Sequence, residues 1–562
     1  MTTPFGAPTQ VQPRSIVSTL IVEPTTGFDV SHSALNIAAG ATPNSDNFIM
    51  RDGRLKPRSG LSMLRLGNDQ TGGTPPFRFY DVCGGTDAVA VGGTRYLLVG
   101  TRSDSSLGTE LQPRMYFRGP GDASWNTASY TTAAGIFDRP VANATNYWDF
   151  TQIYLDRTEE NIVVGALTSR NSGLYCWQPG QTVFSTLTGS PGAKCVAAFD
   201  NYLLAGNVYE GGDTFIQRVR WCDRGSASSW TGGLSGFEDL LSAKGGINRI
   251  LPLENRIAVF FDDEIWTGTP IDFPGTFRFT PLDTSLGCPY PWTVAVTPRG
   301  IVFMARNFQM HLLPKEGGTA VAIGTPIQRS IRDSIEQASR AFGAYDGVNN
   351  FYQFYYNSAG SGNLPHRAVF LNLDTGAWMP QSFSSDQGLL RAFTANIALS
   401  NATSWDEIIV AWDGTTTPWD DMLGLGNERQ VVVAVGTGSG VYIYDSAATR
   451  DSSGNSHVLA YSTFSSFWES KGLGEEWPNA QKTATHVALD YIADSRSSVS
   501  VRMLQGADYA TGEAVSLHTS SRVSQAYAYP YAPSRYAALR VESEGQDFEL
   551  ERMHVTMRIG GR

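Results

Sequence analysis

The sequence of 562 residues has little charge, few cysteines and no long apolar run. Charged residues make up 17% of the chain, against about 25% in average domains. A disordered chain is excluded, because aromatic residues reach 11% and a net charge of -11 is small for this length. Apolar runs such as Val431 to Val435 are strand-sized, far below the about 20 residues that cross a bilayer. We expect a folded chain without a membrane segment and with more than one core, or one large repeated core.

The five cysteines are odd in number and scattered, and no two of them form a C-x-x-C pair. This spacing argues against a disulfide framework and against a zinc ribbon. We expect reduced and mostly buried thiols at these positions, which are Cys83, Cys176, Cys195, Cys222 and Cys288.

Common catalytic signatures are missing as well. The sequence contains no G-x-S-x-G, H-E-x-x-H, P-loop or EF-hand pattern, and its seven histidines never show ligand spacing. One weak enzymatic hint is Asp374-Thr-Gly376-Ala-Trp378, which resembles the Asp boxes on the blade turns of sialidases. The same residues are typical of a hairpin turn followed by a core tryptophan, and a glycosidase also requires a converging carboxylate pair. We therefore predict that the chain is not an enzyme and uses no cofactor or metal.

Basic residues consist of 36 Arg and only 6 Lys, which favours bidentate pairing within interfaces. Five basic residues, Arg51, Arg54, Lys56, Arg58 and Arg65, cluster around Asp52. We predict contacts between subunits for the first four of them. An acidic run, Asp262-Asp263-Glu264, lies between two apolar runs and fits a cation site, a channel-facing rim or a solvated turn. Because the chain is acidic and has no basic region, it is not expected to grip nucleic acid.

Short runs of β-branched and aromatic residues recur from about residue 80 onward, which predicts an all-β protein. Seven of these runs begin 40 to 66 residues apart, near the about 40 to 50 residues of a four-stranded propeller blade. They start at Arg95, Asn161, Asn201, Asn255, Gly300, Asn350 and Glu407. We predict a β-propeller of six to eight blades over residues 76–450, with two or three β-sandwiches as the alternative. One surface helix is predicted from Ser330 to Phe342.

The two ends of the chain have different patterns. From about residue 480 every second residue is apolar, as in Met553 to Ile559, and residues 451–562 fit a C-terminal β-sandwich. Residues 1–75 contain several prolines and few strand signals. We predict an extended N-terminal arm with the first strands there, and expect the arm to lie on a neighbouring subunit.

Four phrases together resemble virion proteins of bacteriophage tails. The first phrase runs from Ser33-Ala-Leu-Asn36 through Asn47 to Gly60, and the second is Arg218-Val-Arg-Trp-Cys-Asp-Arg-Gly225 followed by Trp230. The third is Gly287-Cys-Pro-Tyr-Pro291 followed by Val294 to Phe303, and the fourth is Val441-Tyr-Ile-Tyr-Asp445. The family that they resemble most is the nozzle, or packaged-DNA-stabilising hub, of short-tailed phages. In the second phrase, Cys222 stands where these proteins usually have Ser.

This resemblance implies a homohexameric ring below the portal and adaptor, whose channel retains the genome and conducts it during ejection. The implied partners are the tail adaptor, tail fibres or needle, and double-stranded DNA that passes without specific binding. The implied location is the virion, with assembly in the host cytoplasm. We predict that Asp262, Asp263 and Glu264 face the channel and repel phosphates. Salt screening limits this repulsion to about 8 Å from the wall at physiological ionic strength. The alternatives are a glycan-binding or glycan-cleaving tail protein of the propeller type and an unrelated propeller scaffold.

Overall fold

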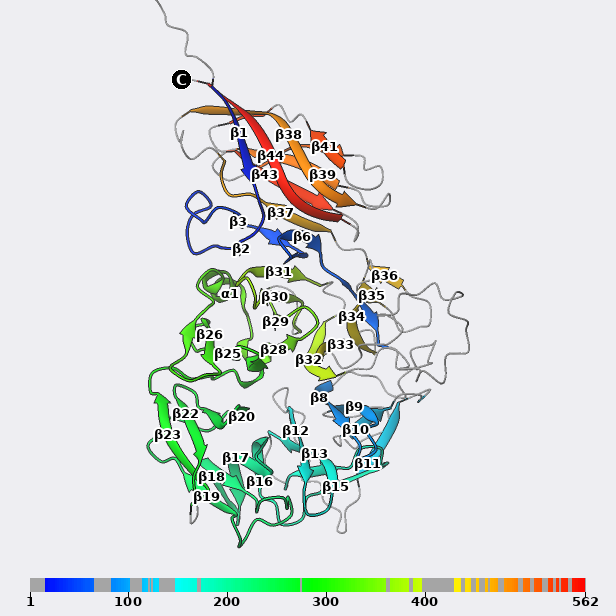
Figure 1. The fold of residues 1–562 in the computed structure, drawn as a ribbon, viewed down its shortest axis with the longest axis vertical. Coiled ribbons are helices and arrows are strands. Elements are labelled where there is room, and N and C mark those ends of the chain that lie inside the picture. The colour runs from blue at the N-terminus through cyan, green and yellow to red at the C-terminus, as the bar shows by residue number, and fades with distance from the viewer. Residues whose placement is uncertain are drawn as a thin grey trace, which may run out of the picture. The chain divides into compact units, whose positions relative to one another are not determined.

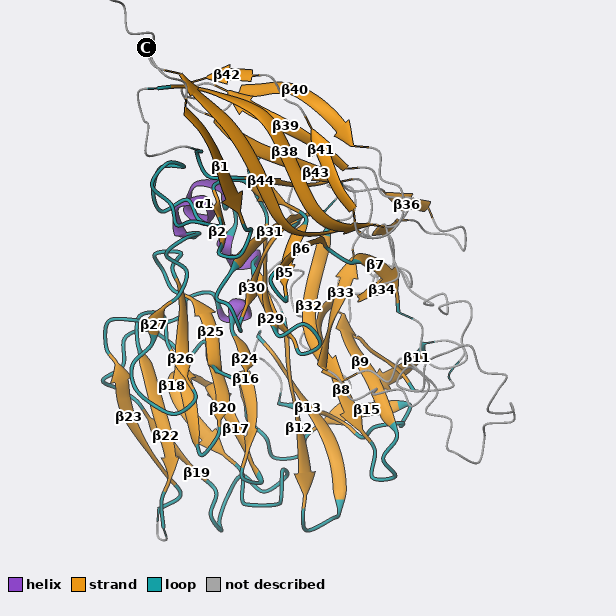
Figure 2. Cartoon of the chain, turned by 45° about the horizontal axis from the view of Figure 1, so that its top comes forward, coloured by secondary structure: helices purple, strands orange, loops and turns teal. Residues whose placement is uncertain are grey.

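A computed structural model shows a nearly all-β chain (Figures 1 and 2). It describes residues 16–64, 82–101, 114–119, 122, 125–130, 147–168, 173–272, 275–359, 364–383, 388–396, 429–435, 440–445, 451–453, 460–462, 465–473, 480–493, 499–505, 510–517, 524–528, 532–534, 537–543 and 548–560. Two compact units are present. One comprises Gly60–Asp374 and Ser382–Ser462; the other comprises Met1–Ser59, Thr375–Gln381 and Thr463–Arg562. Within the described ranges, no helix has the length and apolar character needed to span a membrane.

The larger unit is a β-propeller. Its strands form seven successive groups of four within the described residues, and the first two groups join through a parallel pair between β11 and β15. The first strand of most groups lies toward the middle of the ring, as β8, β12, β20, β28 and β32 show in Figure 1. The first strands, called the inner strands, are β8 (Val82–Val89), β12 (Trp148–Leu155), β16 (Gly192–Phe199), β20 (Arg249–Leu253), β24 (Ala295–Thr297), β28 (Phe342–Asp346) and β32 (Leu389–Asn396). The prediction of six to eight blades is therefore confirmed, with seven.

The repeat seen in the sequence corresponds to the second strand of each blade. These strands are β9 (Arg95–Thr101), β13 (Glu160–Leu167), β17 (Tyr202–Glu210), β21 (Arg256–Phe260), β25 (Gly300–Met304), β29 (Phe351–Tyr356) and β33 (Arg429–Val435). Six of the seven predicted runs begin within a residue of such a strand. The seventh run, at Glu407, lies outside the described residues.

The outer halves of the blades follow the same order. The third strands are β10 (Arg114–Arg118), β14 (Tyr175–Trp177), β18 (Asp213–Trp221), β22 (Ile265–Pro270), β26 (Met310–Pro314), β30 (Arg367–Asn372) and β34 (Gly440–Asp445). The outermost strands are β11 (Asn126–Tyr130), β15 (Val183–Thr186), β19 (Gly236–Asp239), β23 (Phe277–Asp283), β27 (Val321–Ala322) and β7 (Gly60–Met63). In the sixth group the fourth strand is β31 (Trp378–Ser382), of which residues 378–381 are assigned to the other unit.

Strand β7 completes the seventh blade with residues from the N-terminal part of the chain. It pairs antiparallel with β34, with Leu61 opposite Tyr444 and Met63 opposite Tyr442. The propeller therefore begins at residue 60 and not at residue 76, since its last sheet combines β7 from the N-terminal end of the unit with three strands from the C-terminal end. Such pairing closes the ring and leaves no long free edge at that sheet.

Tight hairpin turns join the inner and second strands. Asn201, Glu254 and Asn350 occupy these turns with φ of 60°, 53° and 54°, in the left-handed region that hairpin turns require. Gly300 is needed for a different reason, because a Cβ there would lie 2.1 Å from the carbonyl oxygen of Leu313. These local turn signals explain why the blade period was readable from sequence.

Apolar side chains fill the space between neighbouring blades. Between the third and fourth blades, Leu204 and Val259 are fully buried, and Trp221 meets Phe277 edge-to-face at 5.3 Å. Each blade is apolar on both faces, so stacking the blades removes these faces from water. All five cysteines are free thiols and four are buried, as predicted, and burial raises the pKa of Cys195 and Cys288 to about 12.

Helical structure in the described part of the chain is limited to α1 (Gln328–Ser334) and the 3-10 turns η2 (Pro291–Thr293) and η3 (Ala338–Arg340). The helix predicted from Ser330 to Phe342 is therefore too long. Ile335 already has extended backbone and forms a β-bridge with Ser358. Tertiary pairing thus ends the helix before the periodic apolar pattern does.

The smaller unit is a β-sandwich of two sheets. The seven-stranded sheet contains β41 (Ser524–Ala528), β38 (Gln481–Ala493), β44 (Phe548–Gly560), β6 (Arg54–Pro57), β5 (Phe48–Arg51), β1 (Ile16–Val22) and β42 (Ala532–Ser534). The five-stranded sheet contains β4 (Ser45–Asp46), β37 (Ser466–Glu469), β43 (Ala537–Ser543), β39 (Val499–Gln505) and β40 (Ala510–Leu517). This unit also contains the small pair of β2 (Gly27–Phe28) with β3 (Ala41–Thr42), whereas the pair of β35 (Asp451–Ser453) with β36 (Ala460–Ser462) belongs to the larger unit.

From Met553 to Ile559 alternation places every second residue of β44 in the sandwich core, with Met553, Val555 and Met557 fully buried. The phase changes between Leu550 and Met553, where the pairing with β38 shifts register. Residues 1–75 contribute more strands than an extended arm would. Strand β1 pairs with β44 of the same chain, from Ile16 opposite Ile559 to Val22 opposite Met553. The expectation that the N-terminal arm lies on a neighbouring subunit stays a prediction, because the structure shows only the pairing of β1 within its own chain.

Candidate functional site

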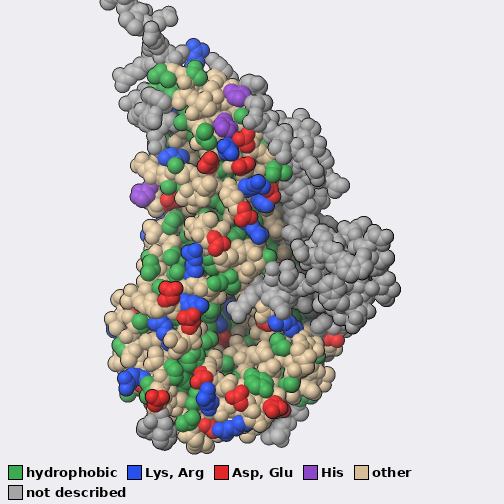
Figure 3. Space-filling model, viewed as in Figure 1, with side chains coloured by type: hydrophobic (Ala, Val, Ile, Leu, Met, Phe, Trp, Pro, Cys, Tyr) green, Lys and Arg blue, Asp and Glu red, His purple; other side chains and the backbone are tan. Residues whose placement is uncertain are grey.

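A cavity of about 230 Å³ lies at the middle of the propeller. Its walls come from six of the seven inner strands and from η2, and Figure 3 shows a hollow at the middle of the ring of sheets. The charged and aromatic side chains of the wall are Trp148, Asp149, Phe150, Arg249, Trp292, Arg391 and Phe393. Ligand pockets of drug-sized molecules usually measure about 300 to 1,000 Å³, so this cavity suits a smaller ligand.

Arg391 is the most unusual residue of the cavity. It lies on β32 in the apolar run Leu389-Leu-Arg-Ala-Phe393 and is 6% exposed. Its guanidinium lies 4.4 Å from the ring centre of Trp292 and 5.3 Å from that of Tyr147. Its Nε and Nη1 are buried without a hydrogen-bond partner. Burial lowers the pKa of Arg391 to about 10, so the side chain stays charged at neutral pH.

Arg249 and Asp149 form an ion pair in the same cavity. Arg249 Nη2 lies 3.0 Å from Asp149 Oδ1, and the backbone N–H of Val196 donates to Asp149 Oδ2 at 3.1 Å. Arg249 Nη1 also donates to the carbonyl oxygen of Pro291 at 3.3 Å. Burial raises the pKa of Asp149, whereas the neighbouring Arg249 acts in the opposite direction. The carboxylate is thus held by two neighbouring strands, β16 and β20.

The charges of the cavity do not balance. Two guanidinium groups, Arg249 and Arg391, share a single carboxylate, Asp149, among the described residues of the wall. A buried charge without a partner is costly, and cation–π contacts offset only about 0.5 to 2 kcal/mol of this cost. The cavity therefore offers N–H donors and positive charge to an anionic or oxygen-rich ligand.

Glycines make room for the large side chains around the cavity. A Cβ on Gly85 would lie 2.3 Å from the Phe393 ring, and one on Gly343 would lie 2.5 Å from the Thr293 carbonyl oxygen. Both positions are on inner strands that line the cavity. Substitution at either glycine would displace the aromatic wall or the backbone beside η2.

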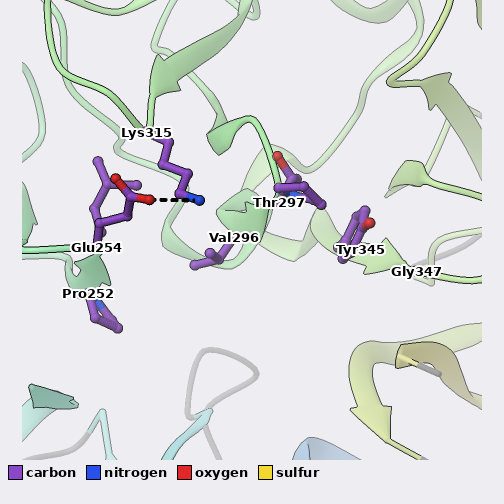
Figure 4. Close-up of a pocket in the computed structure, with 9 residues that line it drawn as sticks. Pro252, Glu254, Val296, Thr297, Lys315, Tyr345 and Gly347 are labelled. Atoms are coloured by element: carbon purple, nitrogen blue, oxygen red, sulfur yellow. Dashed lines mark ion pairs between the residues drawn. The ribbon is translucent and has the colours of Figure 1, made fainter. Parts of the chain in front are cut away.

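A second pocket of about 410 Å³ lies beside the turns of the fourth, fifth and sixth blades (Figure 4). Its walls are largely apolar, and the ion pair between Lys315 Nζ and Glu254 Oε1, 2.7 Å long, lies at its edge. Both charged side chains are more than two fifths exposed. This pocket lacks the buried and unpaired polar groups of the central cavity.

The acidic run predicted to face a channel divides into two kinds of residue. Asp262 accepts a hydrogen bond from Asn248, and Asp263 pairs with Arg306 at 2.7 Å on the surface. Glu264 is instead 3% exposed and accepts from Trp266 Nε1 at 3.0 Å. A channel-facing role for Asp262 and Asp263 stays a prediction. For Glu264 the structure corrects it, because this carboxylate is turned into the fourth blade.

The basic cluster predicted to contact other subunits is largely paired within the chain. Arg54 and Lys56 both pair with Glu549, and Arg51 lies 3.5 Å from Asp52. Arg58 is 1% exposed and donates to Asn47 Oδ1 and to the carbonyl oxygen of Ser59. A subunit contact stays a prediction for Arg51, Arg54 and Lys56, whereas the buried side chain of Arg58 is unsuited to one.

The Asp box-like segment forms a hairpin turn. Asp374 Oδ1 accepts from Asn350 Nδ2 at 2.7 Å, Gly376 has a φ of 78°, and Trp378 is 1% exposed. This is the structural alternative that the sequence offered. The two described pockets each contain one carboxylate, Asp149 or Glu254, and no cluster of three metal-ligating side chains occurs among the described residues.

Sequence reasoning missed Asp149, Arg249 and Arg391. One signal was available, because Arg391 and Asp149 each interrupt an apolar run that was otherwise typical of a buried strand. A charged residue at such a position must be paired or bind something. Their convergence depends on blade order, which the sequence pattern did not supply.

No family model matches the chain, and no curated protein matches it. Solved structures show similarity at low identity. An exo-β-1,3-galactanase from Phanerochaete chrysosporium is 13% identical with a TM-score of 0.27, and the match covers 89% of this chain and 99% of that one. A family 43 arabinoxylan arabinofuranohydrolase from Bacillus subtilis is 10% identical with a TM-score of 0.23, covering 90% and 99%. The WD40 domain of Neurospora crassa Pan2 is 8% identical with a TM-score of 0.33, covering 70% and 96%.

At these identities the comparisons concern fold and identify no substrate or site in this chain. They do correct one expectation. The chain was predicted not to be an enzyme because it lacks common catalytic signatures, yet the solved structures similar to it include glycoside hydrolases. Missing signatures therefore do not place this chain outside the enzymes. The fold and the cavity define the class: a seven-bladed β-propeller with an appended β-sandwich and a charged central cavity.

Proposed function

We propose that the chain is a glycan-binding protein of the propeller type, and that one sugar residue of the glycan enters the central cavity. The observation that carries this proposal is the combination of buried aromatic rings with charged hydrogen-bonding groups whose bonding capacity is incompletely used. Arg391 provides free N–H donors, and Trp292 provides the adjoining aromatic surface.

The chemistry of the wall suits a sugar better than it suits a purely apolar ligand. Hydroxyl groups can accept hydrogen bonds from guanidinium N–H groups and donate to a carboxylate such as Asp149. Aromatic side chains supply the apolar contact surface that a ligand pocket needs. The volume of about 230 Å³ limits the ligand to something near one sugar ring.

Binding is better supported than cleavage. Glycoside hydrolysis usually uses two carboxyl groups about 5 to 10 Å apart, one as acid and the other as base or nucleophile. The described wall of the central cavity contains one carboxyl group, that of Asp149, and this group is already paired with Arg249. Asp149 would be the proton donor in a cleavage reaction, because burial raises its pKa.

The proposal is tested by titrating the purified chain with a panel of monosaccharides and oligosaccharides in an isothermal calorimeter. We expect saturable binding of at least one sugar, weakened by Arg249→Gln. Gly92→Ala serves as a surface control, since a Cβ at Gly92 would meet no atom within 4 Å and Gly92 is not part of the cavity wall. Failure of every sugar in a panel of neutral and acidic glycans to bind would contradict the proposal.

A second proposal is a subunit of the tail hub of a short-tailed phage, which the four tail-like phrases favour. One phrase forms β18 and the turn after it. In that turn, Asp223 accepts from the backbone N–H groups of Arg224 and Leu234 and pairs with Arg157 of the preceding blade at 2.9 Å. The phrase therefore contains a structural link between two blades, as a feature shared by a fold family would.

A hub function requires a channel formed between copies of the chain, because a cavity of about 230 Å³ cannot admit duplex DNA. The proposed ring is a homohexamer. Electron microscopy of virions labelled against this chain would show sixfold density at the base of a short tail. A chain that is absent from virions and monomeric in solution would contradict this proposal and leave glycan binding untouched.

A further inference from the structure

We infer that the central cavity binds a sugar that carries a carboxylate, and that Arg391 holds this carboxylate. The inference rests on the proposed glycan-binding function and narrows its ligand to an acidic sugar, such as a hexuronate. The observations behind it are the burial of Arg391, its unpartnered N–H groups and the charge imbalance of the cavity.

Among the residues that the structure describes, no carboxylate is dedicated to Arg391. Asp149, the carboxylate in the wall, lies 3.0 Å from Arg249 and accepts a further bond from Val196. The remaining contacts of the Arg391 guanidinium are with the rings of Trp292, Tyr147 and Phe342, at 4.4, 5.3 and 5.8 Å. Rings hold a guanidinium in place but do not accept its in-plane hydrogen bonds.

Other buried arginines of this chain are treated differently. Arg218 has two carboxylate partners, Asp239 and Glu210, and Arg118 donates to the carbonyl oxygen of Asp122. A buried Nε without a hydrogen-bond partner also occurs in Arg220, Arg249, Arg502 and Arg540, but each of these four side chains pairs with a carboxylate. Among the described residues, Arg391 differs because two of its nitrogens lack a partner and no carboxylate pairs with it. A ligand carboxylate would supply the missing negative charge and accept from Nε or Nη1.

A carboxylate on a sugar fits the cavity better than a neutral sugar or a bare inorganic anion. A neutral sugar would leave the positive charge of Arg391 uncompensated. A small inorganic anion would neutralise that charge but would leave most of the about 230 Å³ and the aromatic wall without contacts. Cations are disfavoured by the two guanidinium groups.

The test is isothermal titration calorimetry of the full chain with four probes: D-glucuronate, D-glucose, acetate and inorganic phosphate. We expect D-glucuronate to bind about tenfold or more tightly than D-glucose, because a charge-assisted hydrogen bond contributes about 1.5 to 3 kcal/mol. Acetate and phosphate should bind more weakly than D-glucuronate. Arg391→Met should lose about tenfold or more in D-glucuronate affinity, and Arg391→Lys should retain part of it.

The control variant is Arg329→Gln on α1, a side chain 70% exposed, which should bind like the wild type. Circular dichroism of each variant establishes that it is folded, and Arg391→Lys keeps the test valid if Arg391→Met does not fold. Equal binding of D-glucose and D-glucuronate would overturn the acidic-sugar inference and leave glycan binding standing. If acetate or phosphate bound as tightly as D-glucuronate, the inference that the anion must be carried by a sugar would be overturned. Binding of neutral oligosaccharides alone would likewise overturn the inference, whereas failure of all sugars would remove both proposals.

Discussion

Two regions of the propeller bury an arginine in different ways. In the third blade, Arg218 makes two bonds of 2.7 Å to Asp239, a further bond to Glu210, and stacks 3.7 Å from the ring centre of Phe215. In the central cavity, Arg391 also lies against aromatic rings, but its Nε and Nη1 have no acceptor. Both side chains are about nine-tenths buried.

The difference separates a structural arginine from one placed for binding. Hydrogen bonds raise the pKa of Arg218, whereas burial lowers that of Arg391. A guanidinium whose bonds are all made contributes to stability, whereas one with free N–H groups costs stability that only a ligand restores. The same fold thus contains a complete and an incomplete version of one interaction.

The largest loss of stability is expected when the central cavity loses its carboxylate. Asp149→Asn would leave Arg249 without its carboxylate beside the already unpaired Arg391. We expect the free energy of unfolding to fall by about 3 kcal/mol, as for other broken buried ion pairs. Denaturation in guanidinium chloride measures this, and a change below about 1 kcal/mol would show that the cavity tolerates two unpaired charges.

Arg218→Gln should destabilise the chain by about 2 kcal/mol, because it leaves Glu210 and Asp239 without their partner. The loss is smaller than for Asp149→Asn because these two carboxylates are about a quarter exposed and water can solvate them. The same denaturation experiment measures it. A stability gain from Arg218→Gln would mean that the paired arginine is no more structural than Arg391.

Arg391→Met should change the free energy of unfolding in the opposite direction and by a smaller amount. Removing an unpaired buried charge while keeping an apolar side chain of similar length should raise the free energy of unfolding by about 1 kcal/mol in the absence of ligand. Thermal unfolding followed by circular dichroism provides the measurement. A fall of about 2 kcal/mol or more would indicate that Arg391 is a structural residue and would end the comparison.

The smallest effect is expected from two buried histidines, His311 and His366, on the pH dependence of stability. Burial lowers the pKa of His311 and His366, so at neutral pH both avoid the unpaired charge that Arg391 carries. Because their folded pKa values lie below the ordinary value of about 6.5, the stability they contribute is present above that pH and is lost as the pH falls through the folded values. Melting temperatures between pH 7.5 and pH 5 should fall less for the double variant His311→Gln and His366→Gln than for the wild type.

The repeated part of the fold could be predicted because its signals are local. Apolar runs that begin at a polar or glycine turn position, such as Asn201 or Asn350, predicted the second strand of six blades. The strand pairings that the sequence did not predict are non-local. The pairing of β7 with β34 and of β1 with β44 joins segments hundreds of residues apart, and no periodic pattern indicates such partners.

The candidate site was hidden for the same reason. Asp149, Arg249 and Arg391 come from three different blades, and only closure of the ring brings them to one cavity. The acidic run at Asp262 to Glu264 looked more functional because its charges are adjacent in sequence. In the structure its last member, Glu264, is bonded to Trp266 and is buried.

The most direct measurement is a crystal structure of the wild-type chain soaked with D-glucuronate. The account predicts that the sugar occupies the central cavity with its carboxylate within hydrogen-bond distance of Arg391, while Asp149 stays paired with Arg249. An empty cavity in crystals saturated with the sugar, or a sugar bound in the cavity with its carboxylate turned away from Arg391, would contradict it.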